Sequence, residues 1–187
     1  MSSAYETSPI VIPYYTGSGH TRVLAEAVAE GAGGARLIDV ERMGAAEWQA
    51  LDEAQAIIFG APTYFGSTAS GFDQHLIEKV LDRWPDMLWR DKIAAGFTVA
   101  TYHSGDKLSA LMRLAVFAAQ MGMIWVGQDE IGTPVHPDRG PVNASGSWLG
   151  LMARSSRDKS EMIEPEDLAT ARLFGARIAA ATRRWNR

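Results

Sequence analysis

A short run of hydroxyl side chains and glycines separates an apolar segment from a segment of helical period. It reads Thr16-Gly17-Ser18-Gly19-His20-Thr21 and directly follows the apolar residues 10–14. Glycines let backbone N–H groups approach an anion, a helix N-terminus adds a favourable partial charge, and hydroxyl groups donate hydrogen bonds. Capping of a helix by a single hydroxyl is the alternative. Because capping alone does not require three hydroxyls and two glycines, we interpret the run as a phosphate-binding loop.

Two common phosphate motifs do not fit this run. The Walker pattern needs a lysine that is missing here, which argues against hydrolysis of nucleoside triphosphates. The dinucleotide pattern GxGxxG begins with Gly17 and Gly19 but has Arg22 in place of its last glycine. Asp39 stands where that motif has its ribose-binding acid. Dinucleotide binding therefore stays a minor alternative.

Two further runs with chemical potential follow later apolar segments. They are Pro62-Thr63-Tyr64-Phe65-Gly66 and Thr101-Tyr102-His103-Ser104-Gly105. Core aromatics are expected to recur at helix or strand spacing, whereas Tyr64, Phe65 and Tyr102 stand in turns, so we expect them to contact a ligand. An imidazole at His103 suits a hydrogen bond or proton delivery at neutral pH. An ordinary loop histidine is the alternative for His103.

These runs together resemble a known family. The spacing Thr16-x-Ser18-Gly19-x-Thr21 is similar to the T-x-T-G-x-T loop that wraps the phosphate of FMN in flavodoxins. The second run resembles the P-T-x-F/Y-G loop of flavodoxin-like NAD(P)H:quinone oxidoreductases of the WrbA type, the third resembles that family's H-G-G loop, and residues 122–127 resemble its GM-x-x-VG strand. The sequence departs from the WrbA pattern at Ser104 and across residues 134–156.

The resemblance implies tightly bound FMN, NAD(P)H as co-substrate and a quinone or similar small acceptor. It places the cofactor-binding residues at Thr16, Ser18, Gly19, His20, Thr21, Pro62, Thr63, Tyr64, Phe65, Gly66, Thr101, Tyr102, Ser104 and Gly105. His103 is the catalytic candidate. Trp89 resembles a tryptophan near the family's active site, with core packing as its alternative, and Trp148 is a candidate lid or subunit contact. The resemblance also implies a homodimer or homotetramer.

The elements that position these loops alternate between strands and helices, which is typical of a parallel α/β sheet. We predict strands over 10–14, 36–40, 54–60, 93–101 and 124–126, and a flavodoxin-like three-layer sandwich of five parallel strands in the order 2-1-3-4-5. We predict four helices. The first begins at His20, and the last spans about 165–185. The second has apolar residues four apart, at Phe72, Leu76, Val80 and Trp84, and the third has an inward face formed by Leu108, Leu111, Met112, Ala115 and Ala119. We expect one domain over 1–187, with a loose tail at 1–9 and a long active-site or interface loop at 128–160.

Composition excludes several classes of function. The chain has 187 residues and no cysteine, so disulfides, cysteine-ligated metals and thiol nucleophiles are excluded, and redox chemistry needs a bound cofactor. Its four histidines form no ligand pair, so we expect no metal site. A net charge of −4 gives no reason to expect nucleic acid. The apolar stretch 108–127 holds Arg113 and Gln120, so we expect no membrane insertion and, with no export signal, a cytoplasmic location.

Two other functions stay open. One is a flavodoxin-type electron carrier, which would exchange single electrons with protein partners and need no substrate pocket. The other is a flavin reductase, which would release reduced FMN. The mild net charge and the long aromatic-bearing loop favour the quinone reductase.

Overall fold

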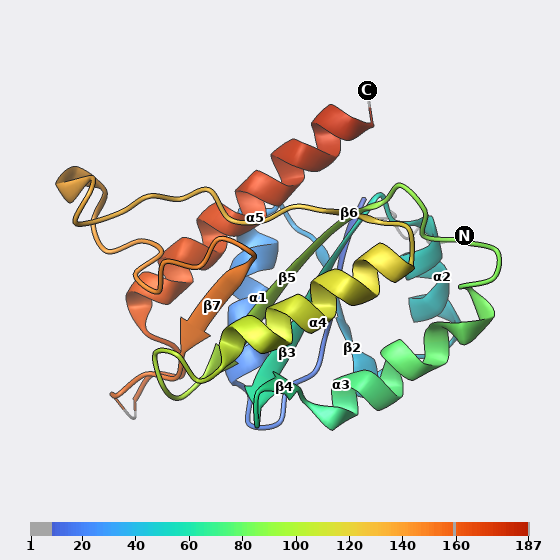
Figure 1. Cartoon of the computed structure of the whole chain (residues 1–187), viewed down its shortest axis with the longest axis horizontal. Coiled ribbons are helices and arrows are strands. Elements are labelled where there is room, and N and C mark those ends of the chain that lie inside the picture. Colours follow the sequence, from blue (N-terminus) through green and yellow to red (C-terminus); the bar gives the residue numbers. More distant parts are fainter. Residues whose placement is uncertain (1–8, 159, 187) are drawn as a thin grey trace, which may run out of the picture.

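The central sheet consists of apolar strands that are buried on both of their faces. In the computed structural model, which describes residues 9–158 and 160–186, all five residues of β1 (Ile10–Tyr14) are buried, as are most of β3 (Ala56–Tyr64) and β5 (Ile93–Ala100). Strands of this kind form parallel sheets that are covered by helices on both sides. Figure 1 shows this arrangement, with α4 in front of the sheet and α1 and α5 behind it.

The remaining elements follow in chain order. They are α1 (His20–Gly31), β2 (Arg36–Asp39), the 3₁₀ helix η1 (Val40–Arg42), α2 (Ala45–Glu53), β4 (Ser67–Thr68), α3 (Ser70–His75), the 3₁₀ helix η2 (Ile77–Asp82), α4 (Lys107–Gln120), β6 (Ile124–Trp125), the 3₁₀ helix η3 (Pro137–Arg139), β7 (Leu151–Arg154) and α5 (Pro165–Trp185).

The sheet has the strand order β2-β1-β3-β5-β6, with these neighbours parallel, and this confirms the predicted flavodoxin-like class. Its fifth position is divided between two strands. β6 pairs with the first two residues of β5, and β7 pairs with residues 97–100 of the same strand. The prediction of one unbroken loop over 128–160 is therefore wrong, because the chain leaves the sheet after β6 and returns to it as β7.

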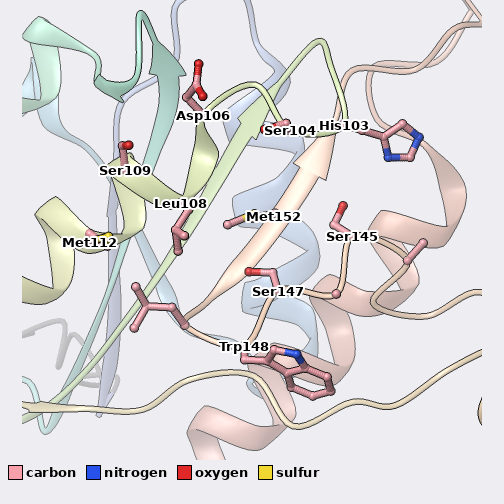
Figure 2. Close-up of a pocket in the computed structure, with 13 residues that line it drawn as sticks. His103, Ser104, Asp106, Leu108, Ser109, Met112, Ser145, Ser147, Trp148 and Met152 are labelled. Carbon is pink, nitrogen blue, oxygen red and sulfur yellow. The ribbon is translucent and has the colours of Figure 1, made fainter.

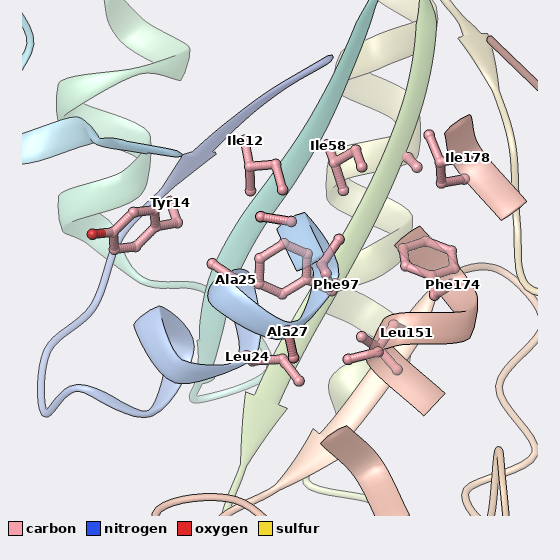
Figure 3. Close-up of a cluster of buried hydrophobic side chains, with 14 of the residues drawn as sticks. Ile12, Tyr14, Leu24, Ala25, Ala27, Ile58, Phe97, Leu151, Phe174 and Ile178 are labelled. Carbon is pink, nitrogen blue, oxygen red and sulfur yellow. The ribbon is translucent and has the colours of Figure 1, made fainter. Parts of the chain in front are cut away.

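Each face of the sheet has its own hydrophobic cluster. On one face, Leu24 of α1 and Phe174 and Ile178 of α5 pack against Ile12 and Phe97 of the strands (Figure 3). On the other face, Phe59 and Trp89 pack with Phe117 of α4. Full burial of one such side chain contributes about 1.5–3 kcal/mol. The two clusters fix the strand ends from which the functional loops emerge.

Several helix predictions need correction. In α4, Leu111 is buried as expected, but Leu108 and Met112 are about half exposed and Ala119 is exposed, because the buried face is formed by residues such as Ala110, Leu114 and Phe117.

The helix predicted around Phe72 to Trp84 is two shorter pieces, α3 and η2, and Trp84 is exposed beyond them. Helix α2 was not predicted. It is short, and Leu51 is its one fully buried residue among those described, so it carries almost no apolar periodicity.

The predicted tail lies outside the described residues except for its last member. The carbonyl of Pro9 accepts hydrogen bonds from the backbone N–H groups of Gln55 and Ala56, so Pro9 already belongs to the sheet region. Within the described part of the chain, none of the helices has the length and apolar character needed to cross a bilayer.

Candidate functional site

A pocket of about 200 Å³ lies where the carboxyl ends of β1, β3 and β5 meet. Parallel sheets of this type bind ligands at that edge. Its lining comes from all three predicted loops, from the end of β5 and from one residue after β7: Gly17, Ser18, His20, Thr21, Pro62, Thr63, Tyr64, Val99, Ala100, Thr101 and Ser155. The structure thus brings the three motifs together in one place.

The first loop presents backbone N–H groups at the start of α1. Gly19 is the residue before the helix and has φ of 94°, a conformation that favours glycine. As a glycine it has no side chain to cap α1, and the first turn of the helix holds no acidic residue. Thr16 Oγ1 accepts hydrogen bonds from the N–H groups of Gly19 (3.1 Å) and Arg22 (3.4 Å), which shapes the loop from within. Direct contact of Thr16 with a phosphate stays a prediction.

The second loop is a β-hairpin rather than an open loop. Tyr64 pairs with Ser67 in β4, and the two residues between them, Phe65 and Gly66, both have positive φ (49° and 77°). Such two-residue turns match the natural twist of a hairpin. The turn leaves Phe65 fully exposed and Tyr64 45% exposed. The ring of Phe65 is therefore free of the protein, and the ring of Tyr64 is partly exposed at the pocket.

The first two loops are in close contact. A Cβ atom placed on Gly17 would lie 2.5 Å from Tyr64 Oη, so a larger residue at this position would displace the tyrosine ring from the first loop. Below them, the hydroxyls of Thr63 and Thr98 share a buried hydrogen bond of 2.7 Å that joins β3 to β5. These contacts hold the lower part of the pocket in shape.

The third loop divides between two cavities. Thr101 lines the pocket just described, whereas His103 and Ser104 line a second cavity of about 760 Å³. Tyr102 is 78% exposed, and Gly105 has a positive φ of 50°. Several predicted cofactor-binding residues do not line the smaller pocket. They are Thr16, Gly19, Phe65, Gly66, Tyr102 and Gly105.

The second cavity lies between the start of α4 and the turn at residues 144–149. In Figure 2, Leu108 and Met112 of α4 face Ser145, Ser147 and Trp148 of the turn across Met152 of β7. No lysine or arginine is among the described residues that line it, and its walls combine apolar side chains with four serines, His103 and Asp106. Trp148 is 54% exposed there, which keeps its role as a lid or subunit contact a prediction.

A charged cluster supports the third loop from behind. Arg154, only 8% exposed, donates to Glu166 Oε1 (2.7 Å), to Asp167 Oδ2 (3.3 Å) and to His103 Nε2 (3.0 Å). Although burial alone would lower the pKa of Arg154, Asp167 and Glu166 outweigh it and raise that pKa. Burial raises the pKa of Asp167, partly offset by hydrogen bonds from Arg154.

Lys107 is the second buried cation at this loop. It is fully buried, and its ammonium donates to the carbonyls of Tyr102 (3.1 Å) and Ala153 (3.0 Å). Burial lowers its pKa to about 8, with Asp167 opposing and Arg154 reinforcing the change. The ammonium thus ties the third loop to β7.

The expectation that Trp89 faces substrate is wrong. Its side chain is fully buried between Phe59 and Phe117, and its indole N–H donates to Asp52 Oδ1 at 2.8 Å. Trp89 precedes β5, so it lies at the amino ends of the parallel strands, opposite to the three loops. The alternative of core packing is confirmed.

The site fits a flavin mononucleotide. The start of α1, which follows a glycine and has no acidic residue in its first turn, and the hydroxyls of Ser18 and Thr21 suit a phosphate. Tyr64, Phe65 and Tyr102 are exposed aromatic rings in the two loops that border the pocket, as a flat ring system would require. The described residues contain no group of three or more His, Asp or Glu side chains placed to hold a metal.

Sequence reasoning missed the residues that support the loops. Ser155 lines the pocket, and Arg154, Asp167 and Lys107 fix the third loop, yet none of them belongs to a recognisable motif. They meet only because β7 returns to the sheet beside β5.

Comparisons with known proteins agree with this site. The model of the family described as NADPH-dependent FMN reductase matches residues 39–136. Flavodoxin FldP of Pseudomonas aeruginosa is 36% identical, over 92% of this chain and 95% of its own. An NAD(P)H dehydrogenase (quinone) of Geotalea uraniireducens is 30% identical, over 94% of this chain and 98% of its own.

Solved structures show the same architecture. A flavodoxin, WrbA-like protein from Agrobacterium tumefaciens superposes with a TM-score of 0.75 at 36% identity, covering 95% of this chain and 98% of that one. A flavodoxin from the domain Archaea superposes with a TM-score of 0.62 at 20% identity, covering 93% and 99%, which is a likeness of fold.

Proposed function

Because this chain belongs to the NADPH-dependent FMN reductase family, as an FMN-binding oxidoreductase that uses NAD(P)H, we propose that its acceptor is a quinone or similar small molecule. The observation that carries the proposal is the presence of two cavities that are both lined by residues of the third loop. The smaller one has the features of a phosphate and flavin site, and the larger one, which an electron carrier would not need, shares the third loop with it. Relatives named NAD(P)H dehydrogenase (quinone) support a quinone as acceptor.

We assign FMN to the smaller cavity. Bound FMN supplies the hydride-transfer chemistry, while the protein binds it, orients it and controls access to it. In our proposal Ser18, His20 and Thr21 hold the phosphate with the N–H groups of α1. Tyr64 and the backbone of the third loop border the ring, with Thr101 nearest to the pocket.

We assign the acceptor to the larger cavity. His103 stands at its edge in the third loop, where its imidazole can form a hydrogen bond with an acceptor oxygen. Trp148 and Met152 supply apolar surface for a carbon ring. The same position takes the nicotinamide donor and the acceptor in turn, so we expect ping-pong kinetics.

An electron carrier is the second candidate, because a relative named flavodoxin shares 36% identity with this chain. One experiment separates the two. The absorption spectrum of the purified protein is recorded, and NADH or NADPH is then added without oxygen. Bleaching of a bound flavin by either nucleotide, followed by recovery of colour on adding benzoquinone, is expected. A flavin that dithionite bleaches but neither nucleotide does would identify a carrier.

The flavin reductase alternative and the cellular location each have a separate test. FMN that behaves as a weakly bound substrate would identify a flavin reductase instead, and dialysis of the coloured protein tests this. A cytoplasmic location stays a prediction, which cell fractionation tests.

We propose that the chain forms a homodimer or homotetramer. Leu108, Met112 and Val116 are more than half exposed at every fourth position of α4. Leu81 and Trp84 are similarly exposed beside that helix, and Ile77 links the two groups. We call this surface the α4 face. A row of exposed apolar side chains of this kind suits contact with the same face of a second copy.

A further inference from the structure

Arg154 lies in the charged cluster behind the third loop and is held from two sides. Its backbone N–H donates to Asp167 Oδ2 at 2.8 Å, and its guanidinium donates to the same oxygen and to Glu166 Oε1. Both carboxylates stand in the first turn of α5. The guanidinium of arginine is a rigid, planar fork of N–H groups, so these contacts also fix the direction of its remaining nitrogen, Nη1.

Nη1 of Arg154 determines which ring nitrogen of His103 carries the hydrogen. Arg154 Nη1 lies 3.0 Å from His103 Nε2. A guanidinium can only donate, so Nε2 must be the acceptor of this bond. A neutral imidazole has one N–H, and the hydrogen is therefore assigned to Nδ1. Figure 2 shows one ring nitrogen of His103 on the side of Ser145 and the other turned away from it.

The backbone of His103 is fixed as well. Lys107 bonds to the carbonyl of Tyr102, the residue before His103, and to the carbonyl of Ala153, the residue before Arg154. Neighbouring residues of β7 thus hold the loop at its backbone and at its imidazole. A free surface histidine would not need this support.

The hydroxyl of Ser145 is a second polar group at the larger cavity. Ser145 Oγ is buried and forms no hydrogen bond with any residue that the structure describes. It lines the larger cavity together with His103. Buried hydroxyls are nearly always paired, so an unpaired one points to a ligand or a water.

We propose that Arg154 is a positioning residue, which presents His103 Nδ1–H beside Ser145 Oγ–H as a pair of donors for one carbonyl oxygen of the acceptor. This rests on the proposed function. Reduction of a quinone to a hydroquinone adds one hydride and one proton. Reduced FMN supplies the hydride, and water supplies the proton, because His103 cannot release Nδ1–H without becoming an anion. His103 and Ser145 instead stabilise the negative charge that develops on the acceptor oxygen.

The hydrogen position can be measured without turnover. In ¹⁵N NMR spectra of the FMN-loaded protein, the neutral His103 ring is expected as the Nδ1–H form. Replacing Arg154 by Met should let the Nε2–H form appear, whereas Arg83→Met, which breaks an ion pair with Asp52 near α2, should leave the His103 signals unchanged. An Nε2–H form in the unaltered protein would overturn the proposal.

Stopped-flow kinetics test the function of the pair. Arg154→Met and Ser145→Ala should each slow reoxidation of the flavin by benzoquinone about tenfold, less than the loss for a fully enclosed donor because His103 is exposed. Reduction of the flavin by NAD(P)H, in which no negative charge develops on an acceptor oxygen, should slow less than reoxidation by benzoquinone does. Because Asp167 would lose its partner in Arg154→Met, Arg154→Lys is the second variant, which keeps a cation there.

Further outcomes distinguish failure of the donor pair from failure of the proposed function. His103→Asn, which keeps a donor near the Nδ1 position, should retain more quinone reactivity than His103→Ala. Equal loss in both half-reactions, or none in either, would contradict the donor pair. If neither nucleotide reduces the flavin, the proposed function fails, while the NMR measurement still decides the role of Arg154.

Discussion

In the proposed site, the phosphate is held by hydroxyl and amide groups instead of charged side chains. No lysine or arginine is among the described residues that line the smaller pocket, and Arg22 in the first turn of α1 is exposed and paired with Glu26. The loop must therefore act through short hydrogen bonds, since a neutral donor has no long-range attraction to offer. This places the affinity for FMN in a few named hydroxyls.

We predict that replacing Thr16, Ser18 and Thr21 together by Ala raises the Kd for FMN about 100-fold. Each hydroxyl contributes about 1 kcal/mol through its hydrogen bond. Thr16 acts by shaping the loop and the other two line the pocket. Quenching of flavin fluorescence during titration of the apoprotein measures the Kd. Thr133→Ala, an exposed threonine in the excursion between β6 and β7, is the matched control, and an unchanged Kd in the triple variant would refute the phosphate loop.

Lys107 gives stability a defined dependence on pH. Its pKa is about 8 in the folded protein and 10.5 in an ordinary environment, so between these values only the unfolded chain keeps the proton. Stability therefore rises as pH increases from 8 to 10, by on the order of 2 kcal/mol from this residue.

Urea unfolding at several pH values measures this rise, and Lys107→Met should reduce it. Lys92 also has a pKa of about 8, because it is partly buried at the end of α2 where it donates to the carbonyls of Leu51 and Asp52. It contributes in the same direction, so the double variant should lose more of the rise than either single variant. A slope in Lys107→Met equal to that of the unaltered protein would contradict the burial of this charge.

At the scale of elements, β7 is the piece on which the site depends. It carries Ala153 and Arg154, which hold the third loop, and Ser155 follows it at the pocket. Just before it, a Cβ on Gly150 would lie 2.4 Å from the carbonyl oxygen of Gly96 in β5. The close approach of the two strands therefore requires glycine at this position.

We predict that Gly150→Ala destabilises the protein by about 2–3 kcal/mol, as overpacking against backbone does. It should also weaken FMN binding, because displacement of β7 releases the third loop. Gly44→Ala is the matched control, since its Cβ would meet only the side chain of Glu47 at 3.4 Å. Thermal unfolding and FMN titration measure the two effects. Equal behaviour of the two variants would show that β7 can shift freely.

The sequence was informative where one element carries its own signal. β1, β3 and β5 were predictable because burial on both faces leaves a continuous apolar run, and the loops after them because hydroxyls, glycines and aromatics cluster there. β7 has only four residues and lies after a stretch rich in glycine and serine, so no period marks it. The contact of Arg154 with His103 spans 51 residues, a separation that no local pattern reveals.

At the scale of the whole molecule, the α4 face is the feature that the monomer leaves unexplained. The register of α4 was predicted with Leu108 and Met112 inward, yet both side chains point outward while Leu114 and Phe117 fill the core. The helix is thus apolar on two sides, more than one sheet can bury. Helices that are apolar on both sides are expected to be covered by a second surface.

We predict that Met112→Arg together with Val116→Arg lowers the oligomeric state without unfolding the chain, because both side chains are more than half exposed. Each exposed apolar side chain buried between copies contributes up to about 1.5–3 kcal/mol, and introduced charges would be left without partners. Sedimentation equilibrium measures the assembly, and circular dichroism checks the fold. Leu173→Arg, on the exposed side of α5, is the matched control and should assemble like the unaltered protein. Met112 also lines the larger cavity, so quinone affinity should change with the assembly if a second copy closes that cavity. A monomeric unaltered protein that turns over quinone at full rate would show that the α4 face serves another partner.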